Sequence, residues 1–336
     1  MSPAPYVQNA GDTFALESSA PGYTPRSRAL AAPLHVLTVI TNPSRYASRY
    51  RLFADFARRV NEAGAVLHVA EAAFGERPHE CHNLAAANHL QLRTDHEIWH
   101  KENLLNLLVA RLPADWKYCA WVDADVFFAR PDWVGETVHQ LQHFSAVQMF
   151  SEATDLGPGE TPFDQYRGFV KCYYERGKKD ANNRYLSWHP GYAWAWRREA
   201  LESVGGFFDT AILGSADQHM ANGLIGRGRA SINPKMHSNY LGEVDRWEAR
   251  AERSIRRNVG YVPGLLLHHW HGRKANRGYL DRWKILVRHQ YNPLTDLKRD
   301  SQGLWQLHDD GSDRLLSLRD EIRAYFRSRN EDVNEL

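Results

Sequence analysis

The sequence predicts one large α/β domain whose first half is a Rossmann-like nucleotide-binding unit. Residues 34–40 form an apolar, β-branched run that stops at a turn-forming stretch, and residues 65–70 form a second such run. A segment with helical spacing lies between them. A third apolar run, residues 118–122, follows another helical segment. The chain therefore opens strand–helix–strand, an order that favours parallel pairing of its first two strands.

The first helix is predicted from aromatic and aliphatic residues that recur at helical spacing. Ser44 or Asn42 is the expected cap, and Gly64 ends the helix. The residues on its apolar face are Tyr46, Tyr50, Phe53, Phe56 and Val60.

The rest of the chain is expected to hold further elements around one core. Helices are predicted over residues 97–111, from Pro131, from Arg197, and over 216–226 and 313–329, with strands over 145–150 and 194–196. Residues 155–187 are interpreted as a loop-rich insertion. We expect a flexible arm over residues 1–32, a catalytic domain over 33–290 and a helical extension over 291–336.

Composition excludes several classes of protein. Of the 336 residues, 43% are hydrophobic and 24% charged, and the net charge is +2, so no strong global attraction to nucleic acid or membrane is expected. Cys81, Cys119 and Cys172 contain no CxxC spacing and predict neither a disulfide framework nor a zinc site. We find no signal peptide and no apolar run long enough to span a bilayer, and expect a cytoplasmic protein.

Two carboxylates stand where the third predicted strand ends, in the stretch Trp121-Val122-Asp123-Ala124-Asp125. In extended chain, residues i and i+2 face the same side, so the pair would converge in the crevice beyond the strand ends where such sheets bind ligands. Two like charges there call for a cation, and Mg²⁺ or Mn²⁺ prefers oxygen ligands and bridges carboxylates to diphosphates. The alternative is that Asp123 or Asp125 caps the next helix or forms a turn.

This arrangement resembles glycosyltransferases of the GT-A fold, in which a DxD motif follows a strand–helix–strand nucleotide-binding half. The resemblance covers most of residues 34–290, and residues 99–103 also look like bacterial and phage transferase-like sequences. It implies a central mixed sheet joining the nucleotide-binding half to an acceptor-binding half. It also implies a hexosyltransferase that uses Mn²⁺ or Mg²⁺ and a nucleotide-sugar, most often a UDP-sugar. Asp123 would contact the nucleotide ribose or the metal, and Asp125 would bind the metal.

A second acidic position follows the stretch Gly205-Gly206-Phe207 and a glycine-containing turn at Gly214. This segment resembles the part of inverting GT-A enzymes that presents the catalytic base, and the match falls on Asp217. Transfer of a sugar to a hydroxyl requires that the hydroxyl lose its proton, which a carboxylate can accept. The alternative is an ordinary acid at a helix N-terminus. The family pattern often has two adjacent acids, whereas this chain has Asp-Gln.

A histidine cluster, His268-His269-Trp270-His271, precedes Gly272, Arg273 and Lys274. On extended chain, His269 and His271 share a face and His268 points away. Neutral imidazole suits Mn²⁺-type ions. The resemblance implies that His269 or His271 completes the metal shell, with His271 preferred because Gly272 lets the chain turn. Arg273, Lys274 and Arg277 would then pair with a diphosphate. The alternatives are a packed core histidine beside Trp270 or a solvated loop.

Several weaker signals accompany these motifs. Thr41, Asn42 and Arg45 follow the first strand, where the base and ribose of a nucleotide lie in this fold. Glu71 ends the second predicted strand and is expected to accept hydrogen bonds from ribose or uracil, unless it is simply on the surface. Lys101 is a candidate for a phosphate contact, although a solvated helix face is the alternative.

A basic stretch over residues 246–288 is interpreted either as a solvated helix or as a surface for a polyanionic acceptor such as DNA. A modified base in phage DNA is one acceptor compatible with a chain that lacks a membrane anchor. Two other functions stay open. One is a metal-dependent nucleotidyltransferase, although no phosphate-binding glycine loop is evident. The other is a non-catalytic carbohydrate- or nucleic-acid-binding protein, which leaves the Asp pair unexplained.

Overall fold

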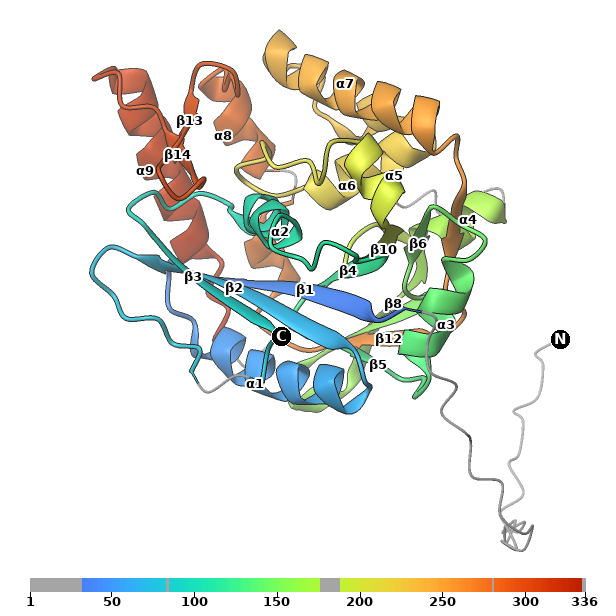
Figure 1. Ribbon diagram of the computed structural model, residues 1–336. Helices are drawn as coiled ribbons and strands as arrows, with labels where there is room; N and C mark the ends of the chain where they lie inside the picture. Colours follow the sequence, from blue (N-terminus) through green and yellow to red (C-terminus); the bar gives the residue numbers. More distant parts are fainter. Residues whose placement is uncertain (1–31, 83–84, 176–187, 280, 334–336) are drawn as a thin grey trace, which may run out of the picture.

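The computed structural model describes residues 32–82, 85–175, 188–279 and 281–333. The arm predicted over residues 1–32 lies, except for residue 32, outside these residues. Among the described residues the central sheet has seven strands and mixed direction (Figure 1). The α/β class with a central mixed sheet is therefore confirmed. The strands in spatial order are β11 (Val259–Tyr261), β6 (Ala146–Gln148), β10 (Ala193–Arg197), β4 (Tyr118–Val122), β1 (Leu34–Thr41), β2 (Val66–Phe74) and β3 (Asn88–Thr94).

The predicted strand–helix–strand opening is confirmed, because β1 pairs in parallel with β2. On its other side β1 pairs in parallel with β4, and β10 runs antiparallel to β4. Strand order therefore reverses between β1 and β4. In such sheets, the crevice at the carboxyl ends of the two central strands is where ligands bind. Here those ends are Thr41 and Val122.

A second sheet lies beside the first and is joined to it through the segment after β4. Its order is β5 (Val126–Phe128), β12 (Leu265–His268), β7 (Glu152–Leu156), β8 (Pro162–Gly168) and β9 (Trp188–His189). Strands β7 and β8 occupy part of the stretch predicted as a loop-rich insertion, so the prediction is wrong there; residues 176–187 lie outside the described residues. Residues 152–156 were not recognised as a strand because Glu152 and Asp155 make the segment look polar. A small hairpin is formed by β13 (Leu297–Arg299) and β14 (Trp305–Leu307).

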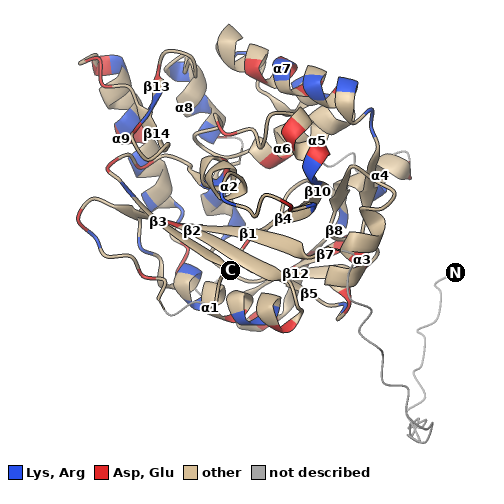
Figure 2. Ribbon diagram, in the orientation of Figure 1, with Lys and Arg blue, Asp and Glu red and all other residues tan. Residues whose placement is uncertain are grey.

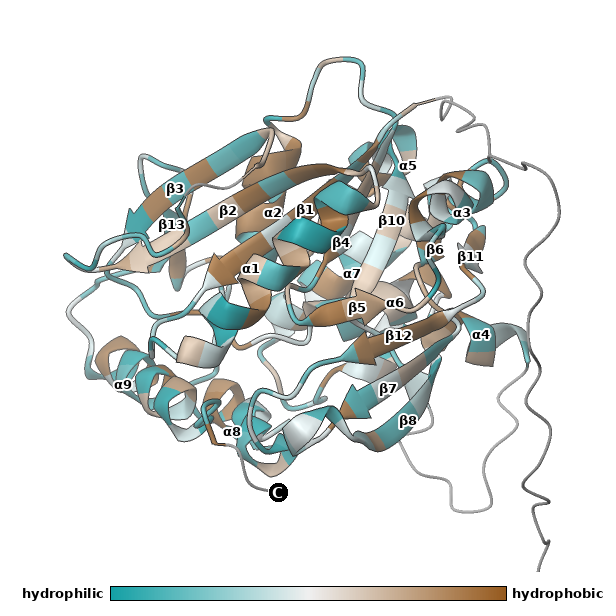
Figure 3. Cartoon of the chain, turned by 90° about the horizontal axis from the view of Figure 1, so that it is seen from below, coloured by the Kyte–Doolittle hydropathy of each residue, from teal (hydrophilic) through white to brown (hydrophobic). Residues whose placement is uncertain are grey.

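Helices cover both faces of the central sheet (Figure 1), and the sheet separates two hydrophobic core clusters. Leu34 and Val36 pack on the face with α1 and α3, whereas Leu37 packs on the face with α2 and α6. Figure 3 shows hydrophobic residues running along β5 and β12, whereas α1 and α9 alternate hydrophobic and hydrophilic residues. The helices are α1 (Ala47–Glu62), α2 (Lys101–Val109), α3 (Trp133–Gln140), α4 (Phe169–Tyr174), α5 (Arg198–Ser203), α6 (Ala216–Leu224), α7 (Ser238–Ser254), α8 (Arg282–Arg288) and α9 (Asp313–Ser328).

Helix α1 is capped by a residue far away in the sequence. Neither Ser44 nor Asn42 caps it: Asn42 Oδ1 accepts from the Tyr46 N–H at 2.9 Å, before the helix begins. The carboxylate of Asp332 accepts from the first helical N–H groups, those of Ala47 and Ser48, both at 2.9 Å. The stretch that follows α9 therefore completes the first helix of the domain.

No helix in the described ranges is long and apolar enough to cross a membrane. Cys81 and Cys119 are buried free thiols.

Candidate metal centre and active site

A cavity opens at the carboxyl ends of β1 and β4, where strand order reverses. Thr41 and Asp123 border it from these strand ends, and Lys101 and Glu102 reach it from α2. Other lining groups come from the second sheet and from the start of α6, together with Arg277, Tyr279, Arg282 and Arg329. Both predicted acidic sites, Asp125 and Asp217, therefore face one space, which we call the central cavity.

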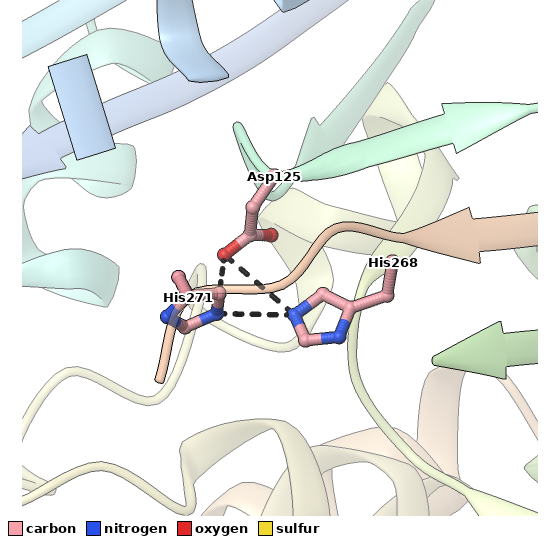
Figure 4. A group of neighbouring side chains, drawn as sticks. All are labelled: Asp125, His268 and His271. Atoms are coloured by element: carbon pink, nitrogen blue, oxygen red, sulfur yellow. Dashed lines mark hydrogen bonds and ion pairs between the residues drawn. The ribbon is translucent and has the colours of Figure 1, made fainter. Parts of the chain in front are cut away.

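Three side chains converge in the central cavity (Figure 4). Asp125 Oδ2 lies 3.0 Å from His271 Nε2 and 3.7 Å from His268 Nε2. The two Nε2 atoms are 3.2 Å apart. These atoms form a cluster of ligand type within 4.8 Å of one another. Both histidines are buried.

Backbone pairing brings this cluster together. Residues 123–125 form the turn between β4 and β5, and Val126 pairs with His268 across β5 and β12. The His269 N–H donates to the Asp125 carbonyl at 2.8 Å. Beyond the strand, Gly272 adopts φ +84°, which side chains other than glycine rarely adopt, and the chain turns there as predicted.

The alternation predicted for the histidines is wrong, because β12 ends at His268 and the cluster contains His268 and His271. His268, expected to point away, is in the cluster. His269 instead lies outside it, with its Nδ1 3.1 Å from Glu160 Oε1. The cluster thus combines residues three apart in the sequence, where the prediction paired residues two apart.

Asp123 and Asp125 both line the central cavity, as expected, but only Asp125 belongs to the cluster. The Asp123 carboxylate forms an ion pair with Lys101 and is not part of the cluster. Lys101 is buried, so the solvated-face alternative does not describe it. Although burial acts to lower it, Asp123 holds the pKa of the Lys101 ammonium above its usual range.

Asp155, which the sequence did not identify, contacts the cluster through the Nδ1 atom of His268. It is 2% exposed, and its Oδ1 accepts from Tyr192 Oη at 2.5 Å and lies 3.0 Å from His268 Nδ1. Lys274 forms an ion pair with Asp155. Although burial acts to raise it, His268 and Lys274 lower the pKa of this carboxyl. No local motif marks Asp155, because its partners are distant in sequence.

The cluster fits a divalent cation. Cis ligands on an octahedral ion with bonds of about 2.1–2.2 Å lie about 3 Å apart, close to the spacing of these three atoms. Asp125 Oδ1 is buried without a hydrogen-bond donor among the described residues, and a carboxylate oxygen of this kind requires a proton or a cation. Although burial acts to raise it, the two histidines hold the pKa of Asp125 well below its usual range. Arg277 Nη2 donates to His271 Nε2 at 3.0 Å and has to leave that nitrogen when a metal binds.

Asp217 stands in the first turn of α6 and lies against Gly191. A Cβ atom at Gly191 would be 2.3 Å from Asp217 Oδ2, so only glycine leaves room for this carboxylate. Glu102, to which the sequence assigned no role, also lines the cavity, and burial raises its pKa to about 8. The cavity thus holds, besides the metal cluster, the carboxylate of Asp217 and a second, mostly neutral carboxyl group on Glu102.

The cations available to a diphosphate differ in part from those predicted. Lys274 is committed to Asp155 and to Asp164, 2.7 Å away, and Arg273 is exposed and outside the cavity lining. Arg277 lines the cavity, as does Arg282, which forms a 2.5 Å hydrogen bond with Ser215. Arg277 was expected here together with Arg273 and Lys274, whereas Arg282 was not, and it is brought in by the 3₁₀ turn at Lys274–Arg277 and helix α8.

Of the weaker candidates near the ends of β1 and β2, one lines the cavity and the others do not. Thr41 lines the cavity. Asn42 is used by the backbone of Tyr46, and Arg45 pairs with Glu80 at 2.5 Å, both outside the cavity lining. Glu71 was expected at the end of the second strand or on the surface, and both expectations are wrong. Strand β2 continues to Phe74, and Glu71 is 2% exposed. Its carboxylate accepts from the backbone N–H groups of residues 80 and 81.

The basic run on α7 carries charges of both signs (Figure 2). Arg246 pairs with Glu243, Arg257 with Glu252 at 3.6 Å, and Arg250 donates to the Val204 carbonyl at 2.6 Å. Nothing in this arrangement supports a DNA acceptor, which stays a prediction.

No family model matches this sequence, and no curated protein matches it. Solved structures do. A Drosophila β-1,4-galactosyltransferase 7 in complex with manganese, UDP-Gal and xylobiose is 11% identical over 83% of this chain and 96% of its own, with a TM-score of 0.38. A glucosyl-3-phosphoglycerate synthase from Mycobacterium tuberculosis, with Mn²⁺, UDP-glucose and phosphoglyceric acid, is 12% identical over 84% and 82%, with a TM-score of 0.38.

A 4-diphosphocytidyl-2C-methyl-D-erythritol synthase from Anaerococcus prevotii is 9% identical over 69% of this chain and 89% of its own, with a TM-score of 0.29. Nucleotide-sugar transferases are thus among the matched structures, as the resemblance to GT-A enzymes predicts. At these identities and scores, however, the likeness assigns neither a family nor an activity to this chain. The functional conclusion therefore depends on the residues of the central cavity.

Proposed function

We propose that this protein is a divalent-metal-dependent glycosyltransferase that moves a sugar from a nucleotide-sugar to an acceptor hydroxyl. One observation carries the proposal. A cluster suited to a metal ion, a group of cations and an acidic side chain, Asp217, line the same cavity at the switch point of an α/β sheet.

The donor half of the reaction depends on positive charge. Asp125, His268 and His271 would hold Mn²⁺ or Mg²⁺, which when bound supplies charge to the diphosphate leaving group. Arg277 and Arg282 line the same space and can bind phosphate oxygens in two-point geometry. The Thr41 hydroxyl is buried without a partner among the described residues and is suited to a nucleoside contact. We propose UDP as the nucleotide.

The acceptor half depends on Asp217. The acceptor oxygen attacks the anomeric carbon, the bond from that carbon to the diphosphate oxygen breaks, and the hydroxyl proton passes to the Asp217 carboxylate. Because Asp217 can take the proton as the acceptor attacks, one direct displacement of the diphosphate is sufficient for transfer. We therefore propose inversion at the anomeric carbon.

The test is a screen of nucleotide-sugars with and without Mn²⁺, read as slow hydrolysis and as thermal stabilisation. We expect one donor to bind in a metal-dependent manner. Asp125→Ala should lose this metal dependence, whereas Asp217→Asn should keep donor binding and lose transfer. No binding of any nucleotide-sugar under either condition would refute the proposed function, and transfer by Asp217→Asn would remove that residue as the base.

The same screen separates the nucleotidyltransferase alternative. A nucleotidyltransferase releases pyrophosphate from a nucleoside triphosphate, so a panel of triphosphates with Mn²⁺ is measured beside the sugar nucleotides. Pyrophosphate release without sugar transfer would favour that alternative.

A further inference from the structure

The stretch Arg329–Val333, after α9, packs against the segment that carries His271. Trp270 Nε1 donates to the Val333 carbonyl at 2.7 Å, and the Asn330 N–H donates to Tyr46 Oη at 2.9 Å. A Cβ atom on Gly272 would lie 2.7 Å from the Glu331 Cα atom. This stretch is thus packed against the histidine turn on one side and against the start of α1 on the other.

Glu331 is the buried acid of this stretch, with 2% of its surface exposed. Its carboxylate receives two bonds from Arg49, at 2.5 and 2.8 Å, and lies 2.6 Å from Arg329 Nε. Oε2 also lies 3.5 Å from His271 Nδ1. That separation is an ion-pair contact and is longer than a formed hydrogen bond.

His271 Nδ1 is itself buried and forms no hydrogen bond among the described residues. Its other nitrogen, Nε2, faces Asp125. A histidine that binds a metal through Nε2 has to carry its proton on Nδ1, and an acceptor at Nδ1 fixes both this tautomer and the ring orientation. The carboxylate of Glu331 is placed to be that acceptor.

The second histidine has the same support from elsewhere in the chain. Asp155 Oδ1 lies 3.0 Å from His268 Nδ1, and Asp155 comes from β7. Each histidine of the cluster therefore has its Nε2 toward Asp125 and its Nδ1 toward a separate buried carboxylate. If Glu331 had only a structural role, its contacts with Arg49 and Arg329 would be sufficient, and its contact with His271 would serve no purpose.

We propose that Glu331 is a positioning residue for the metal centre, which orients His271 through Nδ1 as Asp155 orients His268. This inference rests on the metal site of the proposed function. It makes the stretch after α9 part of the binding site and not only an anchor for α1.

The experiment compares two acids of the same stretch. Glu331→Gln keeps the size of the side chain and removes its charge, whereas Asp332→Asn, the matched control, alters the cap of α1 without a contact to His271. The Mn²⁺ dissociation constant is measured on each purified protein by electron paramagnetic resonance, together with the melting temperature. We expect Glu331→Gln to weaken Mn²⁺ binding by about 10–100-fold. Asp332→Asn should keep the affinity of the wild type.

A double-mutant cycle with His271→Ala separates positioning from general support. If Glu331 acts through His271, the double variant should bind Mn²⁺ no more weakly than His271→Ala alone. Histidine ¹⁴N modulation in the electron spin echo of bound Mn²⁺ should fall in Glu331→Gln and remain in Asp332→Asn. Glu331→Asp, which retains the charge and withdraws the carboxylate, provides a second variant should the first not fold, and it should weaken binding as well.

Three results would overturn the inference: wild-type Mn²⁺ affinity in the Glu331 variants, equal weakening by Asp332→Asn, or additive effects of the His271 and Glu331 substitutions. Failure of the proposed function looks different. In that case the wild type and His271→Ala bind Mn²⁺ equally poorly, and the metal site itself is rejected along with its support.

Discussion

Gly191→Ala should move the proposed catalytic base while leaving the metal cluster in place. The new Cβ atom would lie 2.3 Å from Asp217 Oδ2 and 3.2 Å from His189 Cε1. A carbon and an oxygen in contact need about 3.3 Å, so the carboxylate has to retreat by about 1 Å. Because the nearest atom is the end of a flexible side chain, the fold should tolerate the change.

Displacement of a reacting group by about 1 Å costs up to about 100-fold in rate. We expect kcat for sugar transfer to fall about 10–100-fold, which corresponds to about 1.4–2.7 kcal/mol in the activation barrier. Affinity for the donor and for Mn²⁺ should stay within about twofold, since the substitution touches neither the metal cluster nor the arginines. The assay is steady-state transfer with the donor found in the screen, together with calorimetry for binding.

Gly135→Ala is the matched control, because a Cβ atom there meets nothing within 4 Å and the residue lies inside α3. It should leave kcat unchanged and stabilise the helix by about 0.5–1 kcal/mol. A wild-type kcat in Gly191→Ala would show that the position of the Asp217 carboxylate does not matter to transfer. A parallel loss of Mn²⁺ affinity would show that the strain spreads beyond Asp217.

Three further outcomes are expected. Mn²⁺ at about 100 times its dissociation constant should stabilise the wild type by about 2.7 kcal/mol in thermal unfolding and should not stabilise Asp125→Ala; equal stabilisation of both would place the metal elsewhere. Lys101→Met leaves Asp123, 27% exposed, without its cation and should cost about 1–3 kcal/mol, much of it recovered by adding Asp123→Asn; strict additivity would contradict the pairing. Arg314 donates to Asp296 at 2.7 and 2.8 Å and, against the opposing effect of burial, lowers the pKa of this carboxyl. Asp296→Asn should therefore cost about 1–2 kcal/mol in urea unfolding at pH 7, and the difference from the wild type should shrink as pH falls below about 4; a constant difference would exclude this ion pair as its source.

The elements with a strong local pattern could be predicted from sequence. Strands β1, β2 and β4 are largely apolar runs that lie within a covered sheet, and helix α9 repeats its apolar residues at helical spacing. The position of Asp125 beyond a buried strand followed from the same pattern. Strands β7 and β8 were missed, because acidic and aromatic residues obscure their alternation.

The site was predictable only where its geometry is local. His271 was found because a glycine follows it, whereas His268 was assigned to the wrong face, since no sequence rule places the end of β12 at that residue. Asp155 and Glu331 each act on a histidine that is 113 or 60 positions distant, so no spacing could point to them. Lys101 looked like a surface lysine until its pairing with Asp123 was seen.

The sequence by itself determined that a strand–helix–strand unit ends in an acidic turn, because hydrophobic periodicity and turn residues act over a few positions. The tertiary structure alone decided which side chains meet in that turn. Pairing of β5 with β12 sets His268 beside Asp125, and the return of the chain after α9 brings Glu331 to His271 and Asp332 to the start of α1. These contacts join distant segments, and only the packing of the whole core specifies them.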